Sequence, residues 1–151
     1  MRVFVRSLLP CDPQDAWAEV KRSSLLLEVA RPFVIIRPAK GESFPEQWRV
    51  GETICCRSYM FGVVPLGTRM VSFDTIDNQA REIHTREADP LVRSWNHVIR
   101  VEVADGGSTR YSDDVEIDAG WLTPVVWLFA QCFYRHRQRR WKTVANRLSR
   151  V

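Results

Sequence analysis

A histidine and an aspartate on two neighbouring predicted strands are the residues of this chain best placed to do chemistry. Residues 92–104 and 108–118 both alternate between apolar and polar side chains, and a Gly-rich turn separates them, which predicts a β-hairpin. With the turn centred on Gly106, position 97 faces 115 and position 99 faces 113, so His97 and Asp113 are diagonal neighbours on one inward face. The backbones of diagonal neighbours lie about 7–8 Å apart across the two strands, so their side chains can reach each other. A register shift of two residues would change the partner but not the face.

A histidine beside an aspartate on a cavity wall permits two roles. His97 could be a general base that Asp113 orients, with Tyr111 or Tyr59 donating a hydrogen bond to a developing enolate. The alternative is structural: the two side chains bond each other, buried backbone or a ligand, because a buried carboxylate without a partner is costly. We favour the structural or ligand-orienting role.

The remaining residue types do not indicate another catalytic or metal site. The chain has three histidines and four cysteines without a His-x-x-x-His or Cys-x-x-Cys spacing, so we expect no metal site. It has no Gly-x-Gly-x-x-Gly or phosphate-binding loop, so we expect no cofactor, and no serine lies in a nucleophile elbow. We expect the four cysteines to be reduced, as in a cytoplasmic protein.

The basic residues are concentrated near the end of the chain. The formal net charge is +4, but all 18 acidic residues precede Gly120, so the first 120 residues carry a net charge of −3 and the rest +7. The run 133–141, FYRHRQRRW, is typical of a solvated helix end, where cations favour the negative end of the helix dipole. Contact with an acidic membrane surface or a protein is the alternative. Nucleic-acid binding is not expected, because acidic residues occupy the outward faces of the predicted strands.

The pattern along the chain predicts a strand, two short helices, six further strands and one long helix. Asp12 is a suitable N-cap for the first helix, and Pro32 ends the second, over 24–30. The last helix runs from its expected N-cap, Thr123, to about Leu148. The expected strands cover 2–9, 33–37, 52–61, 68–76, 80–88, 92–104 and 108–118.

These elements fit a single domain, 1–151, of the α+β class. A sheet must bury one face, and only the last helix, whose first half is apolar on nearly all sides, is large enough to cover it. We therefore expect a curved antiparallel sheet of about seven strands wrapped around the long C-terminal helix. No apolar run reaches the about 18–20 residues of a membrane span, and no signal peptide is indicated.

The order of elements and several segments resemble the START-like superfamily, also called SRPBCC and related to polyketide cyclases and dehydrases, which has the helix-grip fold. The segments that carry the resemblance extend over almost the whole chain: LPCDPQDAWAEV, WRVGET, FGVVPLGTR, SWNHVIRVE, TRYSDDVEI and FYRHRQRRW. The resemblance implies a hydrophobic cavity between sheet and long helix, which binds lipids, sterols, polyketides, quinones or plant-hormone-like molecules in different members. It implies no particular ligand, because proteins of one fold have unlike functions.

The implied cavity leads to a functional hypothesis. We expect a START-like domain that binds a hydrophobic small molecule of the lipid, polyketide, quinone or aromatic type, in a pocket of roughly 300–1,000 Å³. The alternative is a cyclase- or dehydratase-type enzyme that uses His97 and Asp113 for proton transfer in the same cavity, and whether a reaction is catalysed stays open. The ligand-binding residues that we expect are Trp95, His97, Ile99, Val101, Tyr111, Asp113, Val115, Arg57, Tyr59, Leu66, Phe129, Cys132 and Phe133.

Two parts of the expected cavity wall are open to alternatives. Arg57 and Tyr59 point inward only if Ile54 and Cys56 point outward, and the two sets are nearly matched in hydrophobicity. The hairpin 61–69, FGVVPLGTR, has an apolar tip, which we expect to form a lid over the cavity; a membrane-docking tip and core packing are the alternatives. The sequence does not indicate the ligand, the pathway or the oligomeric state.

Overall fold

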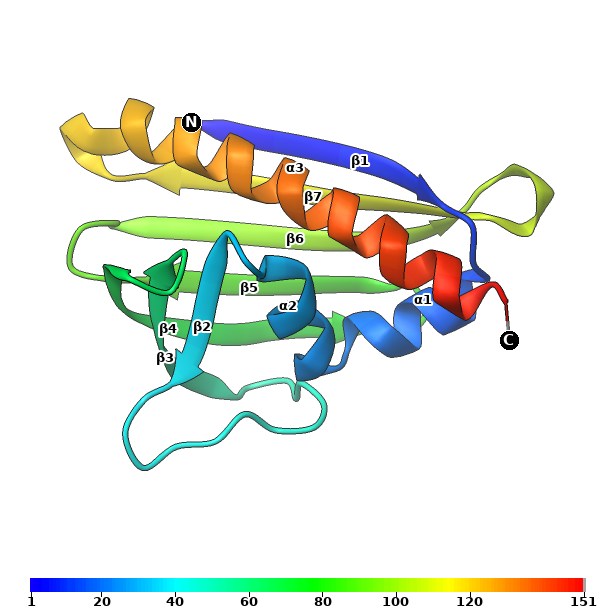
Figure 1. The fold of residues 1–151 in the computed structure, drawn as a ribbon, viewed down its shortest axis with the longest axis horizontal. Helices are drawn as coiled ribbons and strands as arrows, with labels where there is room; N and C mark the ends of the chain where they lie inside the picture. The colour runs from blue at the N-terminus through cyan, green and yellow to red at the C-terminus, as the bar shows by residue number, and fades with distance from the viewer. Residues whose placement is uncertain (151) are drawn as a thin grey trace.

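The centre of the protein is an antiparallel sheet of seven strands in the order β1-β7-β6-β5-β4-β3-β2 (Figure 1). The computed structural model describes residues 1–150. The strands are β1 (Arg2–Leu9), β2 (Val34–Pro38), β3 (Thr53–Met60), β4 (Val64–Asp77), β5 (Glu82–Ala88), β6 (Ser94–Val103) and β7 (Thr109–Asp118). The helices are α1 (Pro13–Val20), α2 (Ser23–Ala30) and α3 (Thr123–Leu148). Each helix and strand that the sequence predicts is present, and β4 begins four residues earlier than expected.

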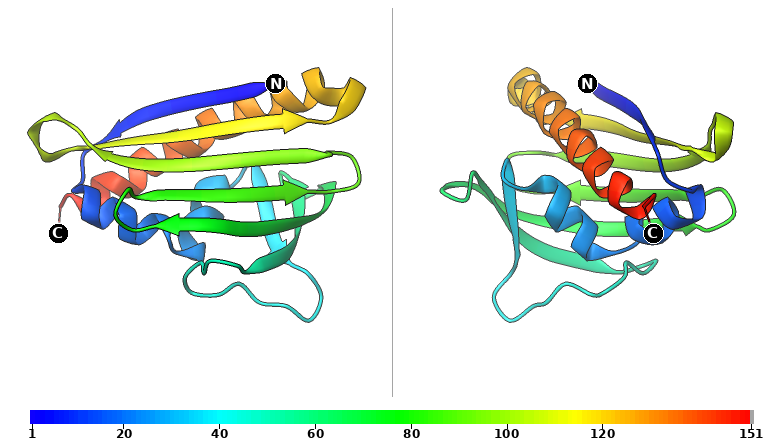
Figure 2. Two further views of the ribbon diagram at one scale, coloured as in Figure 1. Left: turned by 180° about the vertical axis from the view of Figure 1, so that it is seen from behind. Right: turned by 45° about the vertical axis from the view of Figure 1, so that its right-hand side comes forward.

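All three helices lie on the same side of the sheet, which curves around α3 (Figure 2). The long helix α3 contacts β1, β7 and α2. Its buried residues recur every three or four positions between Ala130 and Ala145, which is the spacing of one helix face. This arrangement is the predicted helix-grip fold.

The start of α3 differs in one detail from the prediction. Thr123 is the first helical residue and not the N-cap, which is Leu122. The hydroxyl of Thr123 accepts a hydrogen bond from the backbone N–H of Ala119 at 2.9 Å and donates one to the carbonyl of Gly120 at 2.7 Å. The side chain therefore fixes the turn that leads from β7 into the helix.

The β6–β7 hairpin has the register that the turn at Gly106 predicts. His97 lies opposite Val115, and Ile99 lies opposite Asp113. Gly106 has a φ of 71°, in the left-handed region that glycine adopts without steric cost. His97 and Asp113 are therefore diagonal neighbours, and both are buried beneath α3.

On β3 the structure selects one of the two open assignments. Ile54 and Cys56 are buried, and Ile54 packs in the core against residues of β4 and the loop before β3. Arg57, on the opposite face of the strand, is exposed. The guanidinium of Arg37 lies over the ring of Tyr59, 5.4 Å from the centre of that ring. The expectation that Arg57 and Tyr59 line the cavity is wrong, because packing of the Ile54 side turns them outward.

The apolar hairpin between β3 and β4 is largely exposed. Val63 at its tip is 77% exposed and Phe61 is 59% exposed, although the ring centre of Phe61 lies 5.4 Å from that of Phe33. Further along the strand, Leu66 packs against the second of two core clusters, which surrounds Phe129 and Phe133. The hairpin therefore reaches the interior through Leu66 and leaves its tip in solvent.

Candidate functional site

A buried polar network joins β6, β7 and α3. The Nε2 atom of His97 lies 2.8 Å from Oδ1 of Asp113, and the hydroxyl of Tyr111 donates to the same oxygen at 3.1 Å. The other carboxylate oxygen accepts a hydrogen bond from Nε2 of Gln138 at 3.1 Å, and this amide also donates to the backbone carbonyl of Val5 at 2.7 Å. The network thus ties the long helix to three strands, β1, β6 and β7.

The charges around Asp113 decide its protonation. Burial would raise the pKa of this carboxyl, but the positive charge of Arg137 and the hydrogen bond from His97 outweigh burial, so its pKa is lowered. Burial raises the pKa of Tyr111, and the neighbouring Asp113 adds to the shift. Asp113 is therefore a carboxylate that accepts all its hydrogen bonds, and Tyr111 remains a neutral donor.

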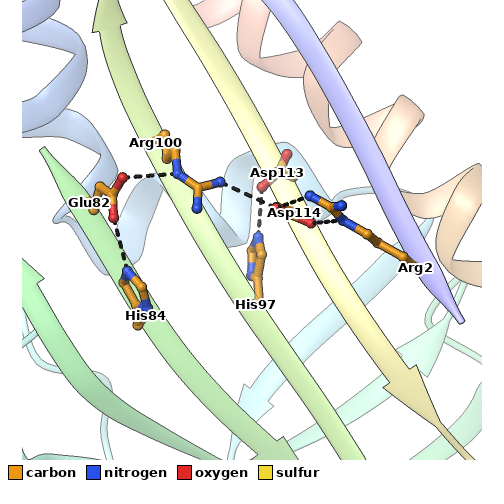
Figure 3. Close-up of polar contacts among 7 residues, drawn as sticks. All are labelled: Arg2, Glu82, His84, His97, Arg100, Asp113 and Asp114. Atoms are coloured by element: carbon orange, nitrogen blue, oxygen red, sulfur yellow. Dashed lines mark hydrogen bonds and ion pairs between the residues drawn. The ribbon is translucent and has the colours of Figure 1, made fainter.

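The opposite face of the same strands carries a chain of ion pairs (Figure 3). Arg2 binds Asp114 at 2.7 Å, Arg100 binds both Asp114 at 3.3 Å and Glu82 at 2.9 Å, and Glu82 contacts His84 at 3.0 Å. These side chains lie at the surface and are partly exposed. His84 is therefore a surface residue, as the sequence indicates. His97, in contrast, faces the interior.

Two adjacent hollows lie between the sheet and the helices. The larger has a volume of about 100 Å³ and the smaller about 60 Å³. Four residues, Leu26, Val71, Glu87 and Arg137, belong to the walls of both. Both volumes are below the roughly 300–1,000 Å³ that the sequence-based hypothesis assumes.

The expected ligand-binding residues fall into four groups relative to the hollows. Leu66, Trp95, Phe129 and Phe133 line the larger hollow, and His97, Ile99 and Tyr111 line the smaller. Val101, Asp113 and Val115 are buried nearby but line neither hollow. Cys132 is exposed on α3, and Arg57 and Tyr59 border a shallow outer depression, so these three are corrections to the expected site.

Arg137 is the main residue that the sequence analysis does not include. It lies in the run 133–141, most of whose cations face solvent, but it is only 8% exposed and lines both hollows. Its guanidinium lies over the rings of Phe133 and Tyr134, at 5.8 and 5.2 Å from their centres. The helical spacing of Arg137 from Trp141 is the signal that could have found it.

Several other polar groups border the hollows. Arg69 lies 4.6 Å above the ring of Trp95 and binds Glu87 and Asp89, each at 3.0 Å. The hydroxyl of Thr85 is buried without a hydrogen-bond partner among residues 1–150, at the wall of the smaller hollow. Burial raises the pKa of the Cys56 thiol to about 12, so this cysteine is not a nucleophile near neutral pH.

Within residues 1–150, no group of three or more His, Cys, Asp or Glu side chains is arranged to hold a metal ion. None of the helices described there combines the length and the apolar character that crossing a bilayer requires.

The fold is a START-like helix-grip fold. The structure is similar to that of protein CV1439 from Chromobacterium violaceum, with a TM-score of 0.73 and 10% identity over 95% of this chain and 96% of the other. It is similar to Ara h 8.0201, with a TM-score of 0.67 and 14% identity over 100% and 99% of the two chains. A START superfamily protein from Mycobacterium smegmatis gives a TM-score of 0.67 and 11% identity over 97% and 98%.

The sequence itself places the chain in a family. Residues 7–144 match the family described as "Domain of unknown function (DUF8410)", and the chain belongs to it. No curated protein matches the sequence.

Proposed function

We propose that this protein binds a hydrophobic small molecule in the space between its sheet and α3. The observation that carries the proposal is the pair of adjacent hollows whose walls are mainly aliphatic and aromatic side chains. The START-like fold agrees with it, because the resemblance drawn from the sequence implies a ligand cavity between sheet and long helix. The ligand classes considered are lipids, polyketides, quinones and aromatic compounds.

The size of the space limits how the ligand is bound. Cavities of about 100 and 60 Å³ hold a short chain or a single ring, and together they form one longer site if the side chains between them move. Leu26 on α2 belongs to both walls, so it lies where the two hollows meet. A larger ligand therefore requires Leu26 and its neighbours to shift. Leu26 lies on the eight-residue helix α2 and not in the hydrogen-bonded sheet.

The test is a titration of the ¹⁵N-labelled protein with octan-1-ol. The indole N–H of Trp95 is the reporter, because Trp95 lines the larger hollow and its Nε1 donates to the Tyr134 hydroxyl at 3.1 Å. We expect saturable shifts at Trp95 and at amides around both hollows. Native mass spectrometry of protein isolated from its own host, which would reveal a retained molecule, identifies the natural ligand class.

A matched pair of variants locates the binding. Leu26→Trp places an indole where the hollows meet and should abolish the octan-1-ol shifts. Leu27→Trp makes the same change one residue along α2, where the side chain lines neither hollow, and should preserve them. Equal titrations of both variants, or shifts scattered over the surface, would contradict the proposal.

An enzyme that transfers protons is the second candidate, and one observation favours it. His97 lines the smaller hollow, its Nε2 is held by Asp113, and its Nδ1 has no hydrogen-bond partner among residues 1–150. A base held in this way is a typical arrangement for proton abstraction. The expected enolate donors, however, do not fit: the Tyr111 hydroxyl donates to Asp113, and Tyr59 lies outside the cavity. Binding without reaction is therefore the function that we favour.

A further inference from the structure

Arg137 lies on the buried face of α3. The buried positions around it are Phe133, Tyr134, Gln138 and Trp141, one turn before and after it. Its side chain projects from this face into the wall that the two hollows share. A guanidinium group is thus presented to an otherwise mainly apolar enclosed space.

The guanidinium contacts the rings of Phe133 and Tyr134 but has no hydrogen-bond or ion-pair partner among residues 1–150. Its Nε is fully enclosed without an acceptor. The other arginine in the same wall, Arg69, differs: its three nitrogens bind Glu87 and Asp89 at 3.0–3.3 Å. A buried cation without hydrogen-bond acceptors is costly, so the free donors of Arg137 require an explanation.

Asp113, the carboxylate with the largest electrostatic effect on Arg137, does not satisfy its hydrogen-bond donors. Asp113 is close enough to help keep the arginine charged, against the effect of burial, and the pKa of Arg137 is raised. The carboxylate itself, however, accepts hydrogen bonds from His97, Tyr111 and Gln138. Arg137 therefore keeps its charge and also keeps its N–H groups free for another acceptor.

A second donor lies beside this guanidinium. The hydroxyl of Tyr134 accepts the hydrogen bond from the Trp95 indole, and none of residues 1–150 accepts its own hydrogen. Tyr134 lines the larger hollow next to Arg137. The two side chains together offer N–H and O–H donors at one side of an apolar space.

We propose that the ligand is an amphiphilic organic acid whose carboxylate binds Arg137 and whose apolar part occupies the larger hollow. This inference rests on the proposed function. A guanidinium presents its N–H groups in a geometry that matches a carboxylate, and such charge-assisted bonds are about twice as strong as neutral ones. Among residues 1–150, the wall of the larger hollow has one cation without an acceptor, which together with the small volume suits a carboxylate better than a phosphate ester. Val34, Ile36 and Phe129 provide walls for the apolar part.

The experiment compares octanoate with octan-1-ol, which has the same chain length without the charge. Both are titrated into the ¹⁵N-labelled protein at pH 7.4, with the Trp95 indole N–H as reporter. We expect octanoate to bind about tenfold more tightly than octan-1-ol, which corresponds to one additional charged hydrogen-bonded contact. Arg137→Met should remove this preference, because it deletes the guanidinium that binds the carboxylate.

Two further variants separate this role from general effects. Arg139→Met makes the same change in charge at an exposed position of α3 and should keep the preference for the acid. Arg137→Lys retains the charge without the planar fork and should keep part of it. Thermal unfolding of each variant establishes that it is folded.

The possible results distinguish the two proposals. Equal affinities of octanoate and octan-1-ol for the wild-type protein would overturn the inference and leave the proposed function standing, and this comparison needs no variant. If Arg139→Met lost the preference for octanoate as fully as Arg137→Met, the preference would be a long-range charge effect, and the inference would also be overturned. If neither compound binds at the hollows, the proposed function fails first.

Discussion

The Nε2 atom of His97 lies 2.8 Å from Oδ1 of Asp113, and the carboxylate that it contacts is completely buried. Three side-chain donors converge on that carboxylate, from β6, β7 and α3: His97, Tyr111 and Gln138. Removing the carboxylate would leave each of these buried donors without an acceptor, and each such loss destabilises the folded protein. The pair therefore stabilises the junction of β6, β7 and α3 beside the smaller hollow, whose wall includes His97.

Asp113→Asn should destabilise the protein strongly. The amide of asparagine offers one acceptor oxygen in place of two, and its NH₂ group would face a donor. We expect the free energy of unfolding to fall by about 2–4 kcal/mol, measured by urea denaturation at pH 7. Asp114→Asn is the control: Asp114 pairs with two partly exposed arginines on the outer face, and its loss should cost less than about 1 kcal/mol.

The stability difference between wild type and Asp113→Asn should depend on pH with a definite sign. The pKa of Asp113 is lower in the folded protein than the about 3.9 of an unfolded chain, because the Arg137 charge and the His97 hydrogen bond outweigh burial. Its stabilisation is therefore complete above about pH 4 and is lost as the pH falls through the folded-state value. The stability difference between wild type and Asp113→Asn should shrink below pH 4. Parallel curves down to pH 2 would contradict an ionised Asp113.

How far the sequence determines this site depends on whether a local pattern assigns each residue to a face. The β6–β7 hairpin has a Gly-rich turn and long alternating strands, so its register and the His97–Asp113 contact are predictable. On β3, Ile54 and Cys56 are hardly more apolar than their alternates, and only the packing of Ile54 in the core with Trp48 and Phe73 decides the inward face. For this reason the sequence leaves Arg57 undecided.

The helix α3 poses a related difficulty. Its first half is apolar on nearly all sides, so no periodicity shows that Cys132 is exposed while Phe133 is buried. In its second half the amphipathic face through Trp141 and Val144 is recognisable. Extending that face back by one turn reaches Arg137, but a cation within a basic run resembles its solvated neighbours. Burial of one arginine among several depends on tertiary packing, which composition does not reveal.

His97→Gln distinguishes binding from catalysis. Glutamine can still donate a hydrogen bond to Asp113, so we expect the affinity for octan-1-ol to stay within about threefold of wild type. The catalytic alternative is tested with octan-2-one in D₂O, where a general base would accelerate exchange of the hydrogens next to the carbonyl. His84→Gln, on the outer face of β5, is the control. Exchange that wild type and His84→Gln accelerate and His97→Gln does not would establish the enzyme in place of the binding protein.

Glu87→Gln should strengthen the binding of an acid. The carboxylate of Glu87 lies in the wall of both hollows, and its Oε2 accepts a hydrogen bond from Arg69 at 3.0 Å. Replacing it removes a negative charge near the proposed ligand and frees a donor of Arg69, and both effects favour an anion. We expect octanoate to bind about threefold or more tightly, with little change for octan-1-ol.

The control for this change lies on the same strand. Glu82→Gln makes the same substitution on the outer face of β5, where Glu82 pairs with Arg100, and should leave both affinities unchanged. The measurement is again the Trp95 indole titration at pH 7.4. A fall in octanoate affinity in Glu87→Gln would mean that Glu87 holds the arginines of the wall in position, because an electrostatic effect on an anionic ligand can only have the opposite sign.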